Sequence, residues 1–267
     1  MSKQRLDTLL VNLNLCSSRQ QAQRLIRAGE VKVNQQIIDK PGTEVDPAVA
    51  IHIRQKPKYV SRGGEKLEGA LMVFKIAVDG RICLDGGIST GGFTDCLLQA
   101  GAKRVYGVDV GYGQVAWNLR QDERVFLKER TNFRYLTYEN LYKDQPPADF
   151  GVMDLSFISL SKVLEPLWQL LVPPREVILL VKPQFEVGRE KVGKKGVVRS
   201  STDQAQAIYK VLQTAQNLGW QYCGLTRSPI KGPEGNIEYL LWMSMEGKNE
   251  SPDLEVIEQI TQKARLH

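Results

Sequence analysis

A glycine-rich loop and a following acidic residue form the first candidate ligand site. The loop reads D-G-G-I-S-T-G-G-F-T-D at Asp85–Asp95, and its glycines let the backbone pass close to a ligand. Asp109 ends the next apolar run, where it can accept hydrogen bonds from ribose hydroxyls. The loop has neither G-x-G-x-x-G nor G-K-[ST], so an adenosyl ligand without a pyrophosphate fits best. Such turns occur in many α/β proteins, and the loop alone does not identify its ligand.

Histidine and cysteine offer little material for other common active sites. The sequence has two histidines, His52 and His267, and its four cysteines contain no C-x-x-C pair. Serine–histidine, cysteine–histidine and zinc-dependent catalysis are therefore disfavoured, and we expect no metal site. Lysine and carboxylate side chains must carry any proton transfer.

Apolar runs alternate with helical stretches around the glycine-rich loop. This alternation predicts βαβ units, and hence an α/β fold with a parallel sheet covered by helices on both faces. A Gly/Pro-rich turn at 231–235 separates the last two runs, which predicts an antiparallel hairpin. The expected strands are Ile82–Leu84, Val105–Val108, Val125–Leu127, Phe150–Met153, Val177–Val181, Tyr222–Leu225 and Ile237–Met243.

Positive charge is concentrated at the N-terminus. Residues 1–60 hold ten Lys/Arg and five Asp/Glu, so most of the net charge of +6 lies in under a quarter of the chain. Ser17 with Gln20 has the spacing of a capping box and predicts a helix that presents Arg24 and Arg27 opposite its apolar stripe. The pattern fits either a solvated face or contact with nucleic-acid phosphates.

Composition argues against a membrane protein. Hydrophobic residues make up 42% of the chain, but the longest apolar runs are short compared with the roughly 20 residues that span a bilayer. Lys3 and Arg5 are not followed by the apolar segment of a signal peptide. We therefore expect a globular, cytoplasmic protein.

The N-terminal pattern resembles the S4 RNA-binding module. The resemblance rests on R-L-D-x-L-L followed by S-R-x-x-A-x-x-L-I-x-x-G-x-V-x-V-N and covers about Arg5–Val45. It implies a small α+β domain that binds RNA. The candidate RNA-binding residues are Arg5, Arg19, Arg24, Arg27 and Lys32.

The chain as a whole resembles the hemolysin-A-like (TlyA) rRNA methyltransferases, in which an S4 module precedes an FtsJ-type domain. The motifs that carry the resemblance are Y-V-S-R-G-G-E-K-L (Tyr59–Leu67), S-T-G-G-F-T-D, M-D-L-S-F-I-S-L (Met153–Leu160), V-K-P-Q-F-E (Val181–Glu186) and G-N-I-E-Y-L-L (Gly235–Leu241). The resemblance implies a seven-stranded, mostly parallel, Rossmann-like methyltransferase sheet. It also implies methyl transfer from S-adenosylmethionine to a ribose 2′-OH of ribosomal RNA, by resemblance that of a cytidine.

The resemblance also implies site residues and domain boundaries. Carried over by position, the FtsJ-type tetrad falls on Lys66, Asp154, Lys182 and Glu238. The implied cofactor-binding residues are Gly87, Ser89, Gly91, Gly92, Phe93, Asp109 and Asn132. We expect an S4-like domain at 1–56, a linker at 57–62, the methyltransferase domain at 63–247 and a helical tail at 248–267.

Methyl transfer requires the 2′-OH to lose its proton, and Lys182 is the predicted base. A free lysine has a pKa near ~10.4, so a like charge at Lys66 and partial burial would have to favour the neutral amine. Asp154 and Glu238 are expected to orient the amines and to oppose that effect.

Two other functions remain as alternatives. One is an RNA- or ribosome-binding protein whose methyltransferase-like domain is inactive, and the intact tetrad argues against it. The other is a pore-forming hemolysin, for which the sequence offers no amphipathic membrane segment.

Overall fold

A computed structural model describes residues 3–54 and 57–265, which form two compact units divided after Pro57. Each unit has hydrophobic core residues of its own. The predicted end of the first domain, residue 56, lies outside the described residues. No described helix combines the length and the apolar character needed to cross a membrane.

The first unit packs two short helices against small sheets. Strands β3, β2 and β5 pair antiparallel in that order, and β1 pairs with β4. The N-cap lies one residue later than predicted: Ser18, not Ser17, accepts a hydrogen bond from the backbone N–H of Gln21 at 3.2 Å, and Gln21 Oε1 accepts one from the N–H of Ser17 at 2.8 Å. The elements are β1 (Gln4–Arg5), α1 (Leu6–Asn12), α2 (Arg19–Arg27), β2 (Val31–Val33), β3 (Gln36–Ile37), β4 (Glu44–Val45) and β5 (Ile51–Ile53).

The second unit is a seven-stranded sheet in the order β11-β12-β10-β9-β6-β7-β8, which confirms the predicted fold class. Strands β10, β9, β6, β7 and β8 are parallel, whereas β12 runs antiparallel to both of its neighbours, β10 and β11. Its strands are β6 (Ile82–Gly86), β7 (Arg104–Val108), β8 (Val125–Lys128), β9 (Phe150–Met153), β10 (Glu176–Val181), β11 (Gln221–Arg227) and β12 (Tyr239–Ser244).

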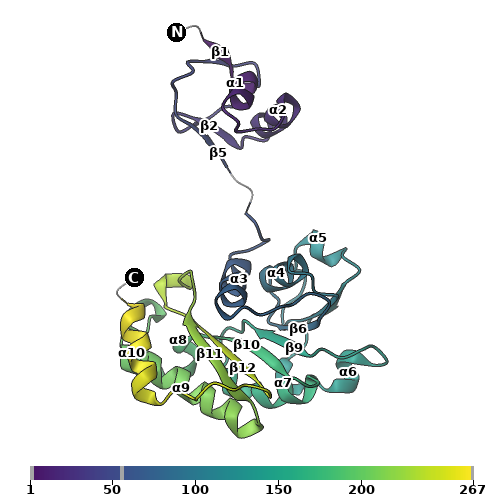
Figure 1. Cartoon of the computed structure of the whole chain (residues 1–267), viewed down its shortest axis with the longest axis vertical. Coiled ribbons are helices and arrows are strands. Elements are labelled where there is room, and N and C mark those ends of the chain that lie inside the picture. The colour runs from purple at the N-terminus through teal and green to yellow at the C-terminus, as the bar shows by residue number, and fades with distance from the viewer. Residues whose placement is uncertain (1–2, 55–56, 266–267) are drawn as a thin grey trace. The chain divides into compact units, whose positions relative to one another are not determined.

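Helices cover both faces of this sheet (Figure 1). Helices α3, α4 and α5 pack over one apolar layer, and α7, α9 and α10 pack over the other. The α-helices are α3 (Gly63–Phe74), α4 (Gly92–Gln99), α5 (Trp117–Arg120), α6 (Tyr138–Tyr142), α7 (Leu164–Leu170), α8 (Pro183–Glu186), α9 (Ser201–Leu218) and α10 (Leu254–Ala264). Short 3-10 turns lie at Phe133–Tyr135 (η1), Leu160–Lys162 (η2), Arg189–Lys191 (η3), Lys194–Gly196 (η4) and Pro233–Gly235 (η5).

Two segments expected to flank the catalytic domain pack into it. Residues 58–62, predicted as linker, belong to the second unit: Tyr59 is buried, and the N–H of Val60 donates to Asp95 Oδ2 at 2.8 Å. The predicted tail contains α10, and its residue Ile257 is fully buried in the core beside α9. Burial of the apolar side chains in both segments removes nonpolar surface from water, and this favours their packing against the domain.

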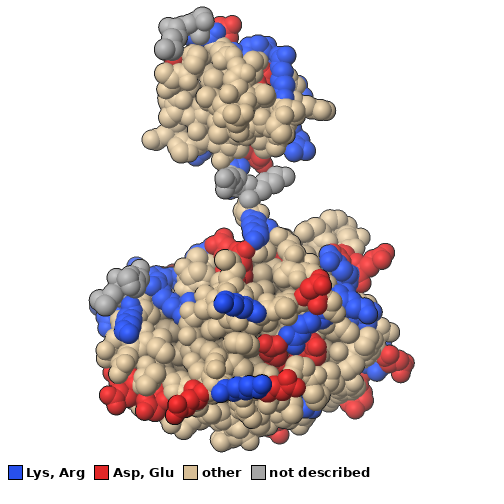
Figure 2. All heavy atoms as spheres, viewed as in Figure 1, with Lys and Arg blue, Asp and Glu red and all other residues tan. Residues whose placement is uncertain are grey.

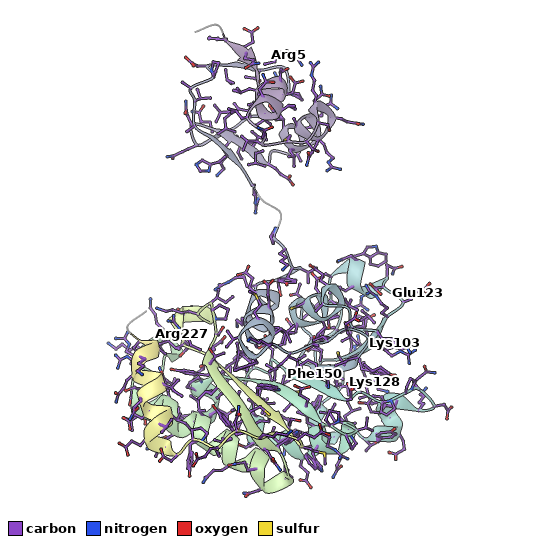
Figure 3. The ribbon with its side chains drawn as sticks, viewed as in Figure 1. Arg5, Lys103, Glu123, Lys128, Phe150 and Arg227 are labelled. Atoms are coloured by element: carbon purple, nitrogen blue, oxygen red, sulfur yellow. The ribbon has the colours of Figure 1, made fainter. Side chains whose placement is uncertain are left out.

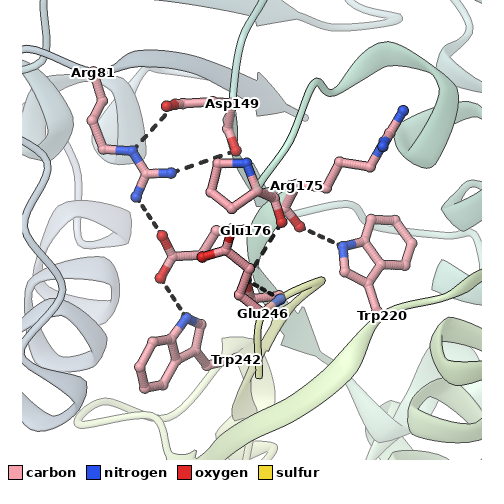
Figure 4. Close-up of polar contacts among 9 residues, drawn as sticks. Arg81, Asp149, Arg175, Glu176, Trp220, Trp242 and Glu246 are labelled. Atoms are coloured by element: carbon pink, nitrogen blue, oxygen red, sulfur yellow. Dashed lines mark hydrogen bonds and ion pairs between the residues drawn. The ribbon is translucent and has the colours of Figure 1, made fainter. Parts of the chain in front are cut away.

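A polar network ties together the amino-terminal ends of three parallel strands (Figure 4). Arg81, just before β6, donates to Asp149 Oδ1 at 3.2 Å and also to Glu176. Trp242 Nε1 donates to the second oxygen of Glu176 at 2.7 Å. Because Asp149 precedes β9 and Glu176 begins β10, this network holds the edge of the sheet opposite the glycine-rich loop.

Candidate active site

The glycine-rich loop connects β6 to α4 at the carboxyl edge of the sheet. Gly87 adopts φ +86°, and a Cβ there would lie 2.6 Å from the carbonyl oxygen of Asp154, so only glycine fits. Gly91 is restricted by its backbone conformation, because its φ of +99° strains any residue that carries a side chain. The backbone at this turn therefore requires glycine, and its close approach to a ligand stays a prediction.

Asp109 follows β7 and fastens the loop. Its Oδ2 accepts a hydrogen bond from the N–H of Ser89 at 2.8 Å, and its Oδ1 accepts one from the N–H of Gly111 at 2.7 Å. A carboxylate oxygen can accept more than one hydrogen bond, so both oxygens can still receive a hydroxyl. Asp109 therefore stays a candidate acceptor for the hydroxyls of an adenosyl ribose.

Two adjoining cavities share Gly87, Ser89 and Asp154. The first, of 420 Å³, is lined by Asp109, Asn132 and apolar residues that include Val108, Phe133, Leu155 and Ile158. The second, of 470 Å³, is lined by Lys66, Gly92 and Phe93 together with Arg62 and Lys231. Six of the seven predicted cofactor residues line one of these cavities, whereas Gly91 shapes the loop from behind.

Asn132, like Ser89, is exposed, whereas the other predicted cofactor residues are buried or half-buried. Its Oδ1 accepts a hydrogen bond from the N–H of Arg134 at 3.1 Å and so caps the η1 turn. The residue is solvent-exposed at the rim of the 420 Å³ cavity.

The four residues of the predicted tetrad come together in two ion pairs. Lys66 Nζ lies 2.5 Å from Glu238 Oε2, and Lys182 Nζ lies 2.6 Å from Asp154 Oδ1. Both lysines are 8% exposed, and Glu238 is 1% exposed. Each ammonium group faces a carboxylate of its own, which offsets the like-charge repulsion expected between the two lysines.

A third cavity, of 440 Å³, is lined by all four of these residues. Lys182 Nζ also donates to Ser156 Oγ at 2.9 Å, so two of its three donor directions are taken and the third can meet a ligand. Glu238 Oε1 is buried and has no hydrogen-bond partner among the described residues. Because such an atom is costly to bury unpaired, it indicates a polar ligand group at this position.

Two residues at the same cavity were not assigned from sequence. Ser156 holds Lys182, and Phe157 projects beside it with 92% of its surface exposed and a φ of +65°. The ring of Phe157 lies 5.3 Å from that of Phe185. An exposed aromatic side chain on a residue in the left-handed backbone region is uncommon, which makes Phe157 a candidate for contact with a ligand. The signal was present, because both residues lie inside the motif M-D-L-S-F-I-S-L.

A buried carboxylate, Glu186, joins the motif that contains Asp154 to the motif that contains Lys182. Its oxygens accept hydrogen bonds from Ser159 Oγ at 2.5 Å and from the N–H of Leu160 at 2.7 Å. Burial raises the pKa of Glu186 above its ordinary value. The contact fixes the segment after Asp154 against the one that follows Lys182.

Asp85, at the end of β6, is a second buried carboxyl group beside the loop. Its Oδ2 accepts from Thr94 Oγ1 at 2.7 Å, and its Oδ1 has no partner within the described part of the chain. Burial raises the pKa of Asp85 to about 7. The group can therefore change its charge near neutral pH.

The predicted RNA-binding residues fall into three groups on the first unit. Arg5 and Arg19 converge on the carboxylate of Asp7. Arg24 and Arg27 are exposed along α2, and Lys32 is exposed on β2. Figure 2 shows basic side chains along one side of this unit.

Comparison with known families agrees with this arrangement. The family described as FtsJ-like methyltransferase matches residues 59–245. The chain belongs to this family. The S4 domain family matches residues 4–51, so an S4 domain precedes the methyltransferase domain. The family predicted from the motifs is confirmed.

Individual relatives match over nearly the whole chain. YqxC of Bacillus subtilis (strain 168) is 49% identical over 93% of this chain and 88% of its own length. The 16S/23S rRNA (cytidine-2′-O)-methyltransferase TlyA of Mycobacterium tuberculosis (strain ATCC 25618 / H37Rv) is 48% identical over 90% of this chain and 89% of its own length. The solved structure of a candidate hemolysin from Streptococcus thermophilus is 41% identical, covers 100% of this chain and 97% of its own, and gives a TM-score of 0.74.

Proposed function

We propose that this FtsJ-like methyltransferase transfers a methyl group from S-adenosylmethionine to the 2′-hydroxyl of a cytidine in ribosomal RNA, in the cytoplasm. The observation that carries the proposal is the pairing of Lys66 with Glu238 and of Lys182 with Asp154 around one cavity, beside a glycine-lined cavity. The cytidine comes from the name of the mycobacterial relative, and the chemistry of the site supports the ribose hydroxyl.

The cavity beside Asp109 suits S-adenosylmethionine. The absence of a side chain at Gly87 would let the ligand approach the backbone, and Asp109 is proposed to accept hydrogen bonds from the ribose hydroxyls. Apolar walls at Val108, Phe133 and Ile158 suit an adenine ring, and Asn132 lies at the rim. When bound, the cofactor supplies a methyl group on a positively charged sulfur, which is the electrophile of the reaction.

In the proposed mechanism, Lys182 acts on the proton of the substrate. The 2′-oxygen would take the methyl group as its bond to sulfur breaks, and the hydroxyl proton would pass to the lone pair of Lys182 in its neutral amine form, which has released a proton to solvent before the step. Asp154, 2.6 Å from Nζ, stabilises the ammonium that forms, and Ser156 holds the same nitrogen in place. Lys66 and Glu238 are proposed to orient the ribose, with the unpartnered Glu238 Oε1 accepting a hydrogen bond from the sugar.

The S4 domain is proposed to deliver the RNA. Arg5, Arg19, Arg24, Arg27 and Lys32 supply exposed or half-exposed cations for phosphates. Phe157 offers an aromatic face on which an unstacked base can lie, because every base has a π-face. Nothing in this assignment requires a metal ion.

The test is to map 2′-O-methylation in ribosomal RNA from cells with and without the gene. The proposal predicts that at least one methylated cytidine disappears with the gene and returns when the gene is restored. If every rRNA methyl mark persists, the substrate assignment is wrong. An inactive RNA-binding protein, the alternative, would bind ribosomal RNA but show no saturable heat with S-adenosylmethionine in calorimetry.

A further inference from the structure

A carboxylate lies buried beneath the arginines of the S4 domain. Asp7, on α1, is 0% exposed. Arg5 donates to both of its oxygens, Nε to Oδ1 at 3.1 Å and one terminal nitrogen to Oδ2 at 2.9 Å. Arg19 Nε and Gln23 Nε2 also donate to Oδ2, at 3.0 and 2.9 Å, and Thr8 Oγ1 lies 3.3 Å from Oδ1. Residues from β1, α1 and α2 therefore meet at one acid.

The two arginine side chains are exposed to solvent, whereas the acid is buried. The side chains of Arg5 and Arg19 are 46% and 56% exposed, against 0% for Asp7. Hydrogen bonds from Arg5 hold the pKa of Asp7 well below its usual range, so the group stays charged in any working buffer. Arg19 contacts the carboxylate only through Nε, so its two terminal nitrogens remain available to a ligand.

We propose that Asp7 is a positioning residue for RNA binding, which holds Arg5 and Arg19 as a fixed pair of guanidinium groups that receive a backbone phosphate. The inference rests on the proposed RNA substrate. Both arginines contact the same oxygen of Asp7, so their guanidinium groups are neighbours with a set orientation (Arg5 is labelled in Figure 3). Fixing two long side chains before binding reduces the entropy lost when the phosphate is bound.

If Asp7 positions the arginines, removal of its charge should change RNA affinity in the opposite direction from that expected from Coulomb attraction alone. Removing a negative charge from a phosphate-binding surface strengthens binding if only Coulomb attraction matters. If Asp7 positions the arginines, the same removal weakens binding, because the guanidinium groups lose their common anchor. The sign of the change therefore separates the two accounts.

The experiment measures binding of the full-length protein to transcribed 23S rRNA by filter retention across a series of KCl concentrations. Asp7→Asn is expected to weaken binding about tenfold at low salt and to reduce the salt slope, since ordered phosphate contacts are lost. Glu44→Gln is the matched control: Glu44 is an exposed carboxylate opposite Arg5 in the β1–β4 pairing. It is expected to bind unchanged or slightly tighter.

A second variant leaves Asp7 itself unchanged. Arg19→Lys keeps the charge but replaces the planar guanidinium group by an ammonium group with one nitrogen. That nitrogen cannot hold Asp7 and at the same time offer two further nitrogens to a phosphate. It should lose nearly as much affinity as Arg19→Ala. Hydrogen exchange of residues 6–27 in the full-length protein reports whether α1 and α2 stay folded in each variant.

The outcomes distinguish this inference from the proposed function. Tighter or unchanged binding by a folded Asp7→Asn protein, or wild-type affinity in Arg19→Lys, would overturn the role of Asp7 alone. If Asp7→Asn unfolds the helices, Arg19→Lys decides. Failure of the wild-type protein to retain 23S rRNA at any salt concentration would instead overturn the proposed RNA substrate, and this inference with it.

Discussion

The two edges of the seven-stranded sheet use charged residues in opposite ways. At the carboxyl edge, Lys182 and Glu238 belong to ion pairs that still have a donor direction and a buried oxygen to offer. At the amino edge, Arg81 joins Asp149 and Glu176 into a network that is satisfied within the protein (Figure 4). Strand direction thus separates groups that can act on a ligand from groups that hold the sheet together.

The largest effect is expected at the carboxyl edge. Lys182→Ala should lower the single-turnover methylation rate about 10² to 10⁴-fold, because the group acts on the reacting proton. Cofactor and rRNA affinities should stay within a few fold. Lys58→Ala, which removes an exposed lysine paired with Glu68, is the control and should keep the wild-type rate. A near-normal rate in Lys182→Ala would eliminate the proposed base.

The next effect is a pH dependence of stability that arises from Asp85. Its pKa is about 7 in the folded protein, above the ~3.9 of an unfolded chain. Between these values only the folded state keeps the proton, so the free energy of unfolding should fall as pH rises from about 4 to 7, by up to ~4 kcal/mol. Urea denaturation of wild type and Asp85→Asn at several pH values measures this. Parallel pH profiles for the two proteins would contradict it.

The amino edge should respond in stability and not in turnover. Arg81→Met removes the guanidinium from two partly buried carboxylates and should cost about 2–3 kcal/mol in unfolding free energy. At a temperature where the variant is folded, its single-turnover rate should match wild type. Arg124→Met, which breaks a surface pair with Asp122, should cost under about 1 kcal/mol. A rate loss in Arg81→Met without loss of stability would erase the contrast between the edges.

The smallest effect is expected at Asn132. Its side chain is exposed at the cavity rim and caps the η1 turn, so Asn132→Ala should weaken cofactor binding only about two- to fivefold. Calorimetric titration with S-adenosylmethionine is the measurement. An unchanged dissociation constant would remove Asn132 from the cofactor site.

The sequence predicted the parts of the site that are encoded locally. Asp154 and Lys182 follow apolar runs that became β9 and β10, so their meeting at one edge follows from strand direction. The alternation of apolar runs and helical stretches predicted the α/β class and the strand positions, whereas the seven-stranded sheet and the site residues Lys66 and Glu238 came from the family resemblance.

Contacts between distant segments could not be predicted in this way. Asp7 meets Arg19 and Gln23 across 12 and 16 residues, and no local pattern marks such a pairing. The insertion of β12 between β10 and β11 likewise depends on tertiary packing. The cap at Ser18 was misplaced by one residue, since Ser17 and Ser18 can both accept a backbone N–H and the geometry of the turn selects one.

The central claim is tested most directly with purified protein, S-adenosylmethionine labelled on its methyl group, and ribosomal RNA from cells that lack the gene. After transfer, the RNA is digested to nucleosides and the labelled product is identified by mass spectrometry. The account predicts label on the ribose of cytidine as 2′-O-methylcytidine, and its loss with Lys182→Ala. Label on a base, or no transfer by a protein that binds both the cofactor and the RNA, would contradict it.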